Sequence, residues 1–384
     1  MDIISLKNAS SHAGKAIKIA GWVFNFRLSG SIYFLQIRDG SGYIQAIVSK
    51  DVVSSKIWDL CAKITQETSV ILEGEITKHP KKEEYELQVK ELEIVQVAEE
   101  YPISKKEHGP DFLLDNRHLW LRSKKQWAIQ KVRNTVINGI YEFLNNDGFN
   151  KIDSPILTPN ACEGTTTLFE LEYFDLGKAY LSQSGQLYLE AAIYSLGKVF
   201  DFGPVFRAEK SKTRRHLTEF WMMDAEMAFY DHEMNMKMQE ELIYSIIQKV
   251  LKECIQELEI LERDIEPLKK IKLPFTRLTH NEAVKKLQKL GSDIKDNEDL
   301  GGDDETLLTK DSDSPVFVDK WPAEIKSFYM KRDESDKLAL CDDLIAPEGF
   351  GEIIGGSQRE DDYNTLEKRI KEHKLPAKDF EWYL

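Results

Sequence analysis

The segment of residues 206–220, FRAEKSKTRRHLTEF, constrains the fold more than any other part of this chain. Apolar runs at 199–206 and 220–229 flank a stretch of Lys, Ser and Thr residues, and this pattern predicts a β-hairpin. Planar cations suit phosphates and a flat ring suits a base, so the segment favours nucleotide binding. If only the charges were present, an exposed charged hairpin would be the better interpretation. The side chains at the loop end of the hairpin are Arg207, Glu209, Arg215, His216 and Phe220.

Composition limits what such a hairpin belongs to. The chain has 384 residues, 41% of them hydrophobic, which is enough to bury a large core and to form two domains. Its 52 Lys and Arg residues against 66 Asp and Glu give a formal charge of -14. Any RNA binding must therefore depend on a local basic or stacking surface. Acidic residues concentrate at 292–313, which we predict to be a solvated loop or insertion.

The cysteines and the apolar runs indicate the cellular environment. Cys61, Cys162, Cys254 and Cys341 are far apart and form no Cys-x-x-Cys pair, which favours reduced thiols over structural zinc. The sequence has no N-terminal apolar h-region and no long apolar run. We therefore expect a soluble, cytoplasmic protein that does not contact a membrane.

Residues 1–100 predict a small β-barrel. Apolar residues recur with period two in short runs from 17 to 97, separated by Gly, Asp and Ser. The runs place Tyr33, Leu35, Ile37, Ile44, Ala46, Val48, Tyr85, Leu87 and Val89 inside, and Phe34, Gln36, Arg38, Gln45 and Glu86 outside. An exposed aromatic beside polar residues suits single-stranded RNA, although spacing alone allows equally that Phe34 packs under a loop.

Residues 101–125 interrupt this rhythm and are predicted to be a linker, because Pro102, Gly109 and Pro110 break regular structure. A helical pattern of apolar residues follows and ends at the plausible C-cap of residues 146–148. Residues 126–384 then form the second domain, and a core helix followed by a strand explains its beginning without any function.

The order of residues in the hairpin resembles motif two of the class II aminoacyl-tRNA synthetases: Arg, then Glu two residues on, then Arg-His, then Phe. Gly148, Phe149 and Pro155 fit motif one, which builds the dimer interface in that family. The segment GWVFNFRLSGSIYFLQIRDGSG is similar to the anticodon-binding domain of the aspartyl and asparaginyl subgroup. The resemblance implies an α+β chain: an N-terminal OB-fold β-barrel, then an antiparallel-sheet catalytic domain flanked by helices, assembled as a homodimer.

The resemblance also implies the roles of individual residues around ATP. Arg207 would bind the α-phosphate and act as the catalytic residue. The remaining ATP-binding residues would be Arg215 and His216 on the outer phosphates, Glu209 on the adenine amino group, Phe220 on the ring face, and Leu217. Along the segment GFGEIIGGSQRE, Glu352 would bind Mg²⁺ and ATP, and Asp343 would be a second Mg²⁺ ligand.

The amino-acid pocket departs from the aspartate-activating members of the family. Those members carry QSP and then a Lys, whereas this chain has Gly185 and Leu189 at these positions. A buried substrate carboxylate needs a nearby cation, but a neutral amide needs an acceptor, which Glu190 provides. The pocket therefore favours asparagine over aspartate. The resemblance assigns the amino-acid substrate to Glu163, Gln186, Glu190 and Arg359, with Glu163 on the α-amino group.

The barrel residues acquire roles in the same way. An aromatic residue of the family stacks on an anticodon base, while a Gln and a Glu read the first anticodon base. These roles would fall on Phe34, Gln45 and Glu86, and Arg27 would contact the RNA backbone. The implied partners are tRNA(Asn), L-asparagine and ATP.

The chain ends at DFEWYL, and its sequence contains no Gly-x-Gly followed by Glu-Arg, the pattern of motif three. We consider three explanations: truncation, a second polypeptide that supplies the segment, or a protein that does not activate amino acids. Truncation is the preferred one, and the isolated 384-residue chain is then expected to fold poorly or to activate asparagine weakly. Two further functions stay open, an adenylating paralogue that makes a small molecule such as asparagine, and a non-catalytic tRNA-binding protein.

Overall fold

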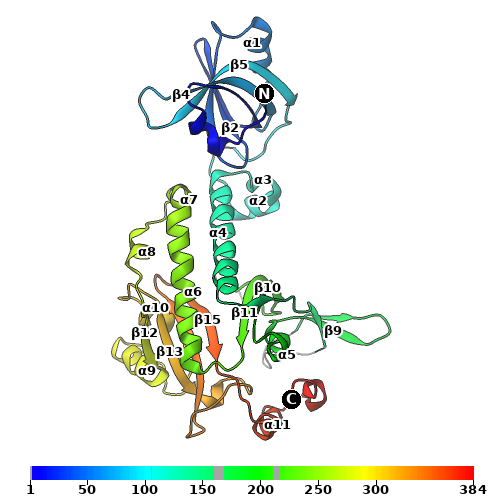
Figure 1. The fold of residues 1–384 in the computed structure, drawn as a ribbon, viewed down its shortest axis with the longest axis vertical. Helices are drawn as coiled ribbons and strands as arrows, with labels where there is room; N and C mark the ends of the chain where they lie inside the picture. Colours follow the sequence, from blue (N-terminus) through cyan, green and yellow to red (C-terminus); the bar gives the residue numbers. More distant parts are fainter. Residues whose placement is uncertain (1, 105, 160–167, 211–215) are drawn as a thin grey trace. The chain divides into compact units, whose positions relative to one another are not determined.

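The computed structural model describes residues 2–104, 106–159, 168–210 and 216–384. Two compact units make up the chain, Met1–Trp127 and Ala128–Leu384, and each has hydrophobic clusters of its own (Figure 1).

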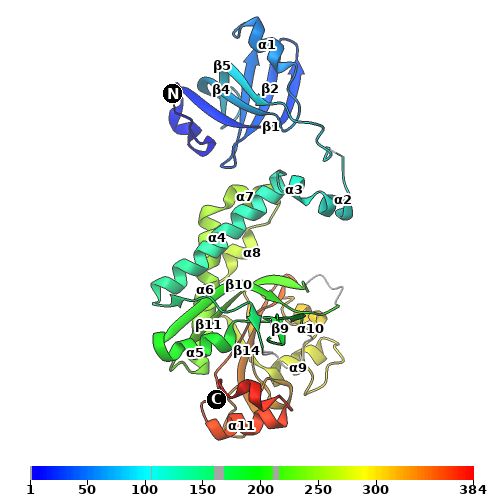
Figure 2. The ribbon, with the colours of Figure 1, turned by 90° about the vertical axis from the view of Figure 1, so that its right-hand side faces the viewer.

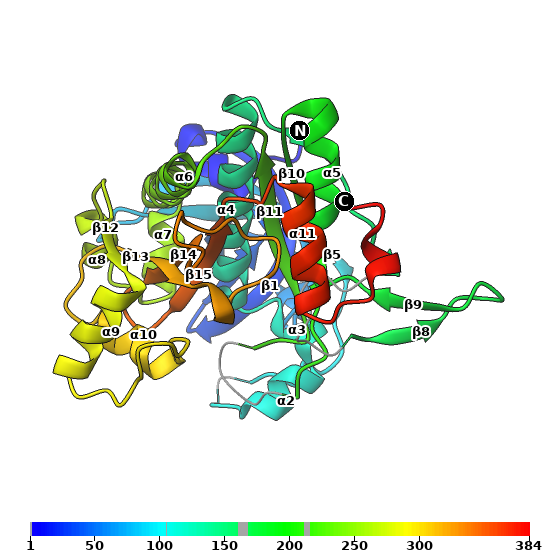
Figure 3. The same ribbon diagram turned by 90° about the horizontal axis from the view of Figure 1, so that it is seen from below.

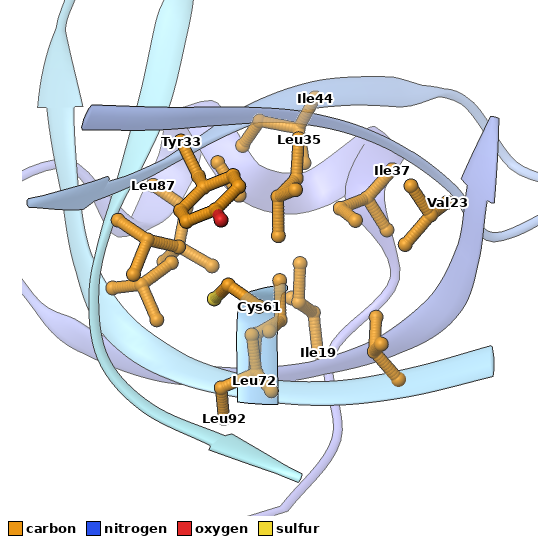
Figure 4. Close-up of a cluster of buried hydrophobic side chains, with 14 of the residues drawn as sticks. Ile19, Val23, Tyr33, Leu35, Ile37, Ile44, Cys61, Leu72, Leu87 and Leu92 are labelled. Carbon is orange, nitrogen blue, oxygen red and sulfur yellow. The ribbon is translucent and has the colours of Figure 1, made fainter. Parts of the chain in front are cut away.

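The first unit contains a closed barrel of five strands in the order β1-β2-β3-β5-β4. Its elements are η1 (Leu6–His12), β1 (Ala16–Ser29), β2 (Ile32–Arg38), β3 (Tyr43–Ser49), α1 (Ser55–Cys61), β4 (Ser69–Lys78) and β5 (Tyr85–Gln96). Alternate residues of β2 and β3 are buried, as the period-two pattern predicted, and Figure 4 shows several of them meeting at the barrel axis. The helix α1 adds Ile57 and Cys61 to this core.

Two residues that we expected on the outer face of the barrel are buried. Arg38 is 7% exposed because its Nη2 atom lies 2.9 Å from Oε2 of Glu67, and it also donates to the carbonyl oxygen of Arg122. Glu86 is likewise 7% exposed, since Gln45 and His79 cover its carboxylate. The alternation of a strand gives the face of a side chain, and neighbouring side chains decide its exposure.

The segment after the barrel is not an irregular linker throughout. It contains the short helices α2 (Pro110–Asp115) and α3 (Arg117–Trp120). Within the first unit this segment contacts the barrel. Trp127 Nε1 donates to the Gly40 carbonyl at 2.8 Å, and Arg122 Nη1 lies 3.3 Å from Glu67 Oε2.

The second unit is built around two long helices that lie side by side (Figure 2), α4 (Lys124–Asn146) and α6 (His232–Glu253). The predicted C-cap of α4 is confirmed, because Gly148 has φ 82° and its N–H donates to the Asn145 carbonyl. The helix α6 buries Met238 and Leu242 against Phe200, and buries Met236 against Phe317 and Leu344. It therefore joins the cores of two sheets.

Three sheets complete the unit, in the strand orders β11-β10-β6, β12-β13-β14-β15 and β7-β9-β8. The remaining elements are β6 (Asn150–Lys151), β7 (Leu157–Thr158), β8 (Glu170–Glu172), β9 (Lys178–Leu181), α5 (Gln186–Leu196), β10 (Lys198–Phe206), β11 (Glu219–Met227), α7 (Ile255–Ile260), α8 (Glu266–Lys270), β12 (Thr276–Thr279), α9 (His280–Lys289), α10 (Gly302–Leu308), β13 (Val316–Pro322), η2 (Ala323–Ile325), β14 (Leu338–Ala346), β15 (Gly351–Ser357), α11 (Tyr363–Glu372) and η3 (Ala377–Phe380). Most strand pairs are antiparallel, and β10–β6 and β12–β13 are parallel.

The acidic segment 292–313 differs from the solvated loop that we expected. It contains the helix α10, and Ile294 and Leu308 are buried in the same cluster as Trp321. Its acidic side chains therefore cover a packed element.

Candidate active site

The predicted nucleotide hairpin forms as β10 and β11, which pair in antiparallel register from Lys198↔Met227 to Phe206↔Glu219. At its end the Arg207 N–H donates to the Thr218 carbonyl at 3.1 Å, and the Arg207 guanidinium lies 5.6 Å from the centre of the Phe220 ring. Arg207, Glu209 and Phe220 thus share one end of the hairpin, and Glu209 is half-buried. His216 and Leu217 are exposed, while Arg215 and Glu163 lie outside the described residues.

The predicted amino-acid pocket involves the helix α5, whose N-terminus is hydrogen-bonded to the hairpin. Oδ2 of Asp224 in β11 accepts hydrogen bonds from the Gly185 N–H at 2.8 Å and from the Ser184 hydroxyl at 3.2 Å. Gln186 and Glu190 are four residues apart on one helical face, and Gln186 Nε2 donates to Glu190 Oε1 at 2.8 Å. Leu189, at the position where the resemblance implies Lys in aspartate-activating members, is fully buried.

Arg359, which follows β15, connects this helix to the hairpin. Its Nε atom lies 3.3 Å from Glu190 Oε1, and its Nη2 atom donates to Glu226 of β11. Three segments far apart in sequence therefore meet at one charged centre, beside the ring of Tyr329 at 5.1 Å. Figure 3 shows β11, α5 and the C-terminal segment on the same side of the molecule.

The electrostatics of this centre follow from its burial. Burial raises the pKa of Glu226 to about 7, with Glu190 adding to the rise and Arg359 opposing it. The two carboxylates in turn raise the pKa of the Arg359 guanidinium, against the effect of its burial. The two glutamates therefore share one arginine, which stays charged and offsets one of the two negative charges.

Two members of the centre escaped the sequence prediction. Glu226 is a carboxylate in an otherwise largely apolar strand, and this was a usable signal. Tyr383, whose hydroxyl donates to Glu190 Oε2 at 2.5 Å, lies in the C-terminal segment and follows no pattern that points to the pocket.

The two predicted metal ligands lie on neighbouring strands. Asp343 in β14 pairs with Gly355 in β15, and a Cβ atom at Gly355 would lie 3.0 Å from Glu352 Oε1 and 3.8 Å from Asp343 Oδ1. Lys326 Nζ lies 3.0 Å from Oδ2 of Asp343, which leaves Oδ1 facing Glu352. Desolvation and the Asp343 charge raise the pKa of Glu352, and a divalent cation would offset that repulsion.

The donor set is compatible with Mg²⁺ but small. Within residues 2–104, 106–159, 168–210 and 216–384, no group of three or more His, Cys, Asp or Glu side chains is arranged to hold a metal ion. Because Mg²⁺ usually keeps waters and binds one or two carboxylates together with substrate phosphates, the pair Asp343 and Glu352 fits this mode.

The four predicted RNA-contacting residues form two pairs on the barrel strands, and Glu86 is the buried member of the second pair. The Arg27 guanidinium lies 4.4 Å from the centre of the Phe34 ring, and the two residues are cross-strand partners. Gln45 and Glu86 are neighbours on β3 and β5, and Gln45 Nε2 donates to Glu86 Oε1 at 2.6 Å.

Comparison with known proteins identifies the family. A profile for tRNA synthetases class II (D, K and N) matches residues 109–384, and a profile for the OB-fold nucleic acid binding domain matches residues 17–95. The chain belongs to the class II tRNA synthetases of this D, K and N family.

The most similar relatives include asparagine enzymes. An asparagine–tRNA ligase of Desulforamulus reducens is 51% identical over 381 residues, covering 99% of this chain and 88% of the relative. The asparaginyl-tRNA synthetase of Pyrococcus horikoshii, solved with asparaginyl-adenylate, has a TM-score of 0.95 and 44% identity, covering 100% of this chain and 89% of that one. The Entamoeba histolytica enzyme with asparaginyl-adenylate has a TM-score of 0.87 and 28% identity, with the same coverage.

Proposed function

We propose that this chain is an asparagine–tRNA ligase. It activates L-asparagine with ATP to asparaginyl-adenylate and transfers the asparaginyl group to tRNA(Asn). The observation that carries the proposal is the Glu190 centre, where a buried acceptor is placed by Gln186 and Arg359 and where Leu189 stands instead of a lysine. The relatives with bound asparaginyl-adenylate support the same substrate.

The first chemical step needs positioning and charge rather than a protein nucleophile. The asparagine carboxylate attacks the α-phosphate of ATP, and pyrophosphate leaves. Arg207 stabilises the charge that develops on the α-phosphate, and the Phe220 ring packs against adenine. Glu209, Leu217, Arg215 and His216 contribute to the ATP site, and Glu163 binds the α-amino group of asparagine. Asp343 and Glu352 would hold Mg²⁺, which supplies charge neutralisation for the phosphates.

Selection of asparagine rests on hydrogen-bond polarity. The side-chain amide of asparagine donates to Glu190 and accepts from Arg359. An aspartate carboxylate has no proton to donate and faces the Glu190 charge, so it is rejected by several kcal/mol, on the order expected for an unpaired buried charge.

The second step uses the barrel. Phe34 stacks on an anticodon base, Gln45 and Glu86 read the first anticodon position, and Arg27 contacts the backbone. The chain has a net charge of -14, so this local face must supply the attraction to RNA. We place the protein in the cytoplasm, where tRNA is charged. Among the described residues, no helix is long and apolar enough to cross a membrane.

The protein also forms a homodimer in this proposal. Gly148, Phe149 and Pro155 match the family segment that builds the dimer interface. Ile156 and Leu157, directly after Pro155, are 44% and 41% exposed, so apolar surface is present where a second copy would pack. Sedimentation should give a dimer, and Leu157→Glu should shift it toward the monomer.

The decisive test compares amino acids in ATP–pyrophosphate exchange. Asparagine should support exchange and aspartate should not, so the ratio between them is the readout. Glu190→Gln should lower kcat/KM for asparagine roughly 10- to 100-fold, the loss expected for a hydrogen bond to a charged group. Equal exchange with both amino acids, or an unaffected Glu190→Gln variant, would contradict the proposed specificity.

A further inference from the structure

We infer that Tyr383 is a positioning residue for amino-acid selection that acts through Glu190. Its hydroxyl donates to Glu190 Oε2 at 2.5 Å, across 193 residues of sequence. The inference rests on the proposed asparagine activation and adds a residue to that pocket. The first observation behind it is that the Glu190 carboxylate has donors on both of its oxygens.

Those donors come from three segments. Oε1 of Glu190 accepts a hydrogen bond from Gln186 Nε2 at 2.8 Å and lies 3.3 Å from Arg359 Nε. Oε2 accepts a hydrogen bond from the Tyr383 hydroxyl. A carboxylate oxygen accepts two hydrogen bonds, so Oε2 keeps one lone pair for a substrate N–H. Tyr383 thereby fixes which direction the carboxylate presents to the substrate.

The tyrosine is a permanent donor. Burial, and then the Glu190 charge, raise the pKa of its hydroxyl well above the usual value, so the proton stays on the tyrosine. The substrate therefore meets an acceptor, which matches the N–H donors of asparagine and mismatches the carboxylate of aspartate.

The ring of Tyr383 is held by packing that is independent of Glu190. It lies 6.1 Å from the Phe328 ring, centre to centre, in an edge-on arrangement, beside the cluster that contains Leu366, Ile370 and Phe380. The Tyr383 N–H donates to the Phe380 carbonyl at 3.0 Å. Because this packing holds the Tyr383 ring, its hydroxyl restricts the rotamer of the Glu190 side chain.

A neighbouring tyrosine offers a matched control. Tyr188 lies on α5, two residues before Glu190, and its hydroxyl bonds to Thr158 at 2.7 Å instead of to Glu190. Tyr188→Phe also removes a tyrosine hydroxyl, but from the helix that carries Glu190 and without removing a hydrogen bond to Glu190. It should leave the choice between asparagine and aspartate unchanged.

The experiment measures equilibrium binding of asparagine, aspartate and ATP to the 384-residue chain by calorimetry. Tyr383→Phe should weaken asparagine binding about tenfold, as expected for one hydrogen bond to a charged group. The ratio of asparagine to aspartate affinity should fall, and ATP affinity should stay within about twofold. Unchanged asparagine binding, or an equal loss for ATP, would overturn the inference.

A double-mutant cycle shows whether Tyr383 acts through Glu190. In a Glu190→Gln background, Tyr383→Phe should have less than about a twofold effect, because the partner that it positions has changed. An effect as large as in the wild type would identify a merely structural residue. If the wild-type chain binds no asparagine, the proposed function itself fails; if it binds asparagine and Tyr383→Phe binds equally well, only the present inference fails.

Discussion

Asp201 and Asp224 face each other across β10 and β11, beneath the first turn of α5. Burial and then the Asp224 charge raise the pKa of Asp201 to about 6, while Ser154 partly offsets the rise through a hydrogen bond. Asp224 holds the Gly185 N–H, so its carboxylate supports the substrate helix. The Asp201 carboxylate, in contrast, is an electrostatic cost of this arrangement.

This cost predicts a pH-dependent stability. The folded state binds the Asp201 proton more tightly than the unfolded state does, so stability is lost as pH rises from about 4 through about 6. We compare the free energy of unfolding of Asp201→Asn with that of the wild type. This difference should favour the variant by up to about 3 kcal/mol more at pH 7.5 than at pH 4. Urea unfolding across this range measures the gain. Parallel curves for the variant and the wild type would contradict it.

A second carboxylate provides a control of opposite sign. Asp362 caps α11, and its hydrogen bonds with Thr365 lower its pKa. Its stabilisation is present above the unfolded pKa and is lost as pH falls. In Asp362→Asn the free energy of unfolding should therefore fall less on acidification than in the wild type. In Asp201→Asn the free energy of unfolding should instead be higher near neutral pH.

At the scale of elements, β4 and β5 show how one residue allows two strands to pair. The register shifts between Glu73 and Gly74, and a Cβ atom at Gly74 would lie 2.1 Å from the Gln88 carbonyl oxygen. Because that neighbour is backbone, the strand cannot yield by a side-chain rotation. The closure of the barrel thus requires glycine here.

The corresponding prediction is a loss of barrel stability. Gly74→Ala should destabilise the first unit by about 2–3 kcal/mol, the range for forced overpacking. Gly109→Ala is the matched control, because a Cβ atom there would meet nothing within 4 Å and its φ is -65°. It should change stability by no more than about 0.5 kcal/mol. Equal unfolding midpoints for the two variants would show that the strands adjust.

For the whole molecule, the two units separate two functions. Phe34 lies in the first unit, while Arg207, Glu190 and Arg359 lie in the second. A change on the barrel face should therefore affect tRNA and leave adenylate formation unaltered.

Phe34→Ala tests this separation. Loss of one base stack, worth about 1–3 kcal/mol, should raise the KM for tRNA(Asn) roughly 5- to 100-fold. Asparagine-dependent ATP–pyrophosphate exchange should stay at the wild-type rate, and the two assays on one preparation measure both effects. A parallel fall of both would indicate a folding defect, and unchanged charging would remove Phe34 from the RNA contact.

Local patterns in the sequence were sufficient for the elements. The alternation around Tyr33 and Leu35 predicted the barrel interior, the apolar runs predicted the β10–β11 hairpin, and Gly148 predicted the end of α4. Each of these features depends on residues a few positions apart, because side-chain direction in strands and helices follows a fixed period. Gln186 and Glu190 meet for the same reason.

Only the tertiary structure decided which distant charges meet. Arg38 was expected at the surface, but a bidentate contact with Glu67 buries it. The acidic segment 292–313 was expected to be a solvated loop or insertion, but it contains α10, and Ile294 and Leu308 pack in the cluster of Trp321.

The sequence by itself determined the barrel strands, the β10–β11 hairpin, the end of α4 and the residue types that we assign to ATP, asparagine and RNA, whereas α2, α3 and α10 were not predicted. The tertiary structure decided that Arg359 contacts both Glu190 and Glu226, and that the Tyr383 hydroxyl donates to Glu190. These partners are separated by more than a hundred residues, so no local period relates them. Their approach depends on the packing of α5, β11 and the C-terminal segment, which brings buried charges together only where each is compensated.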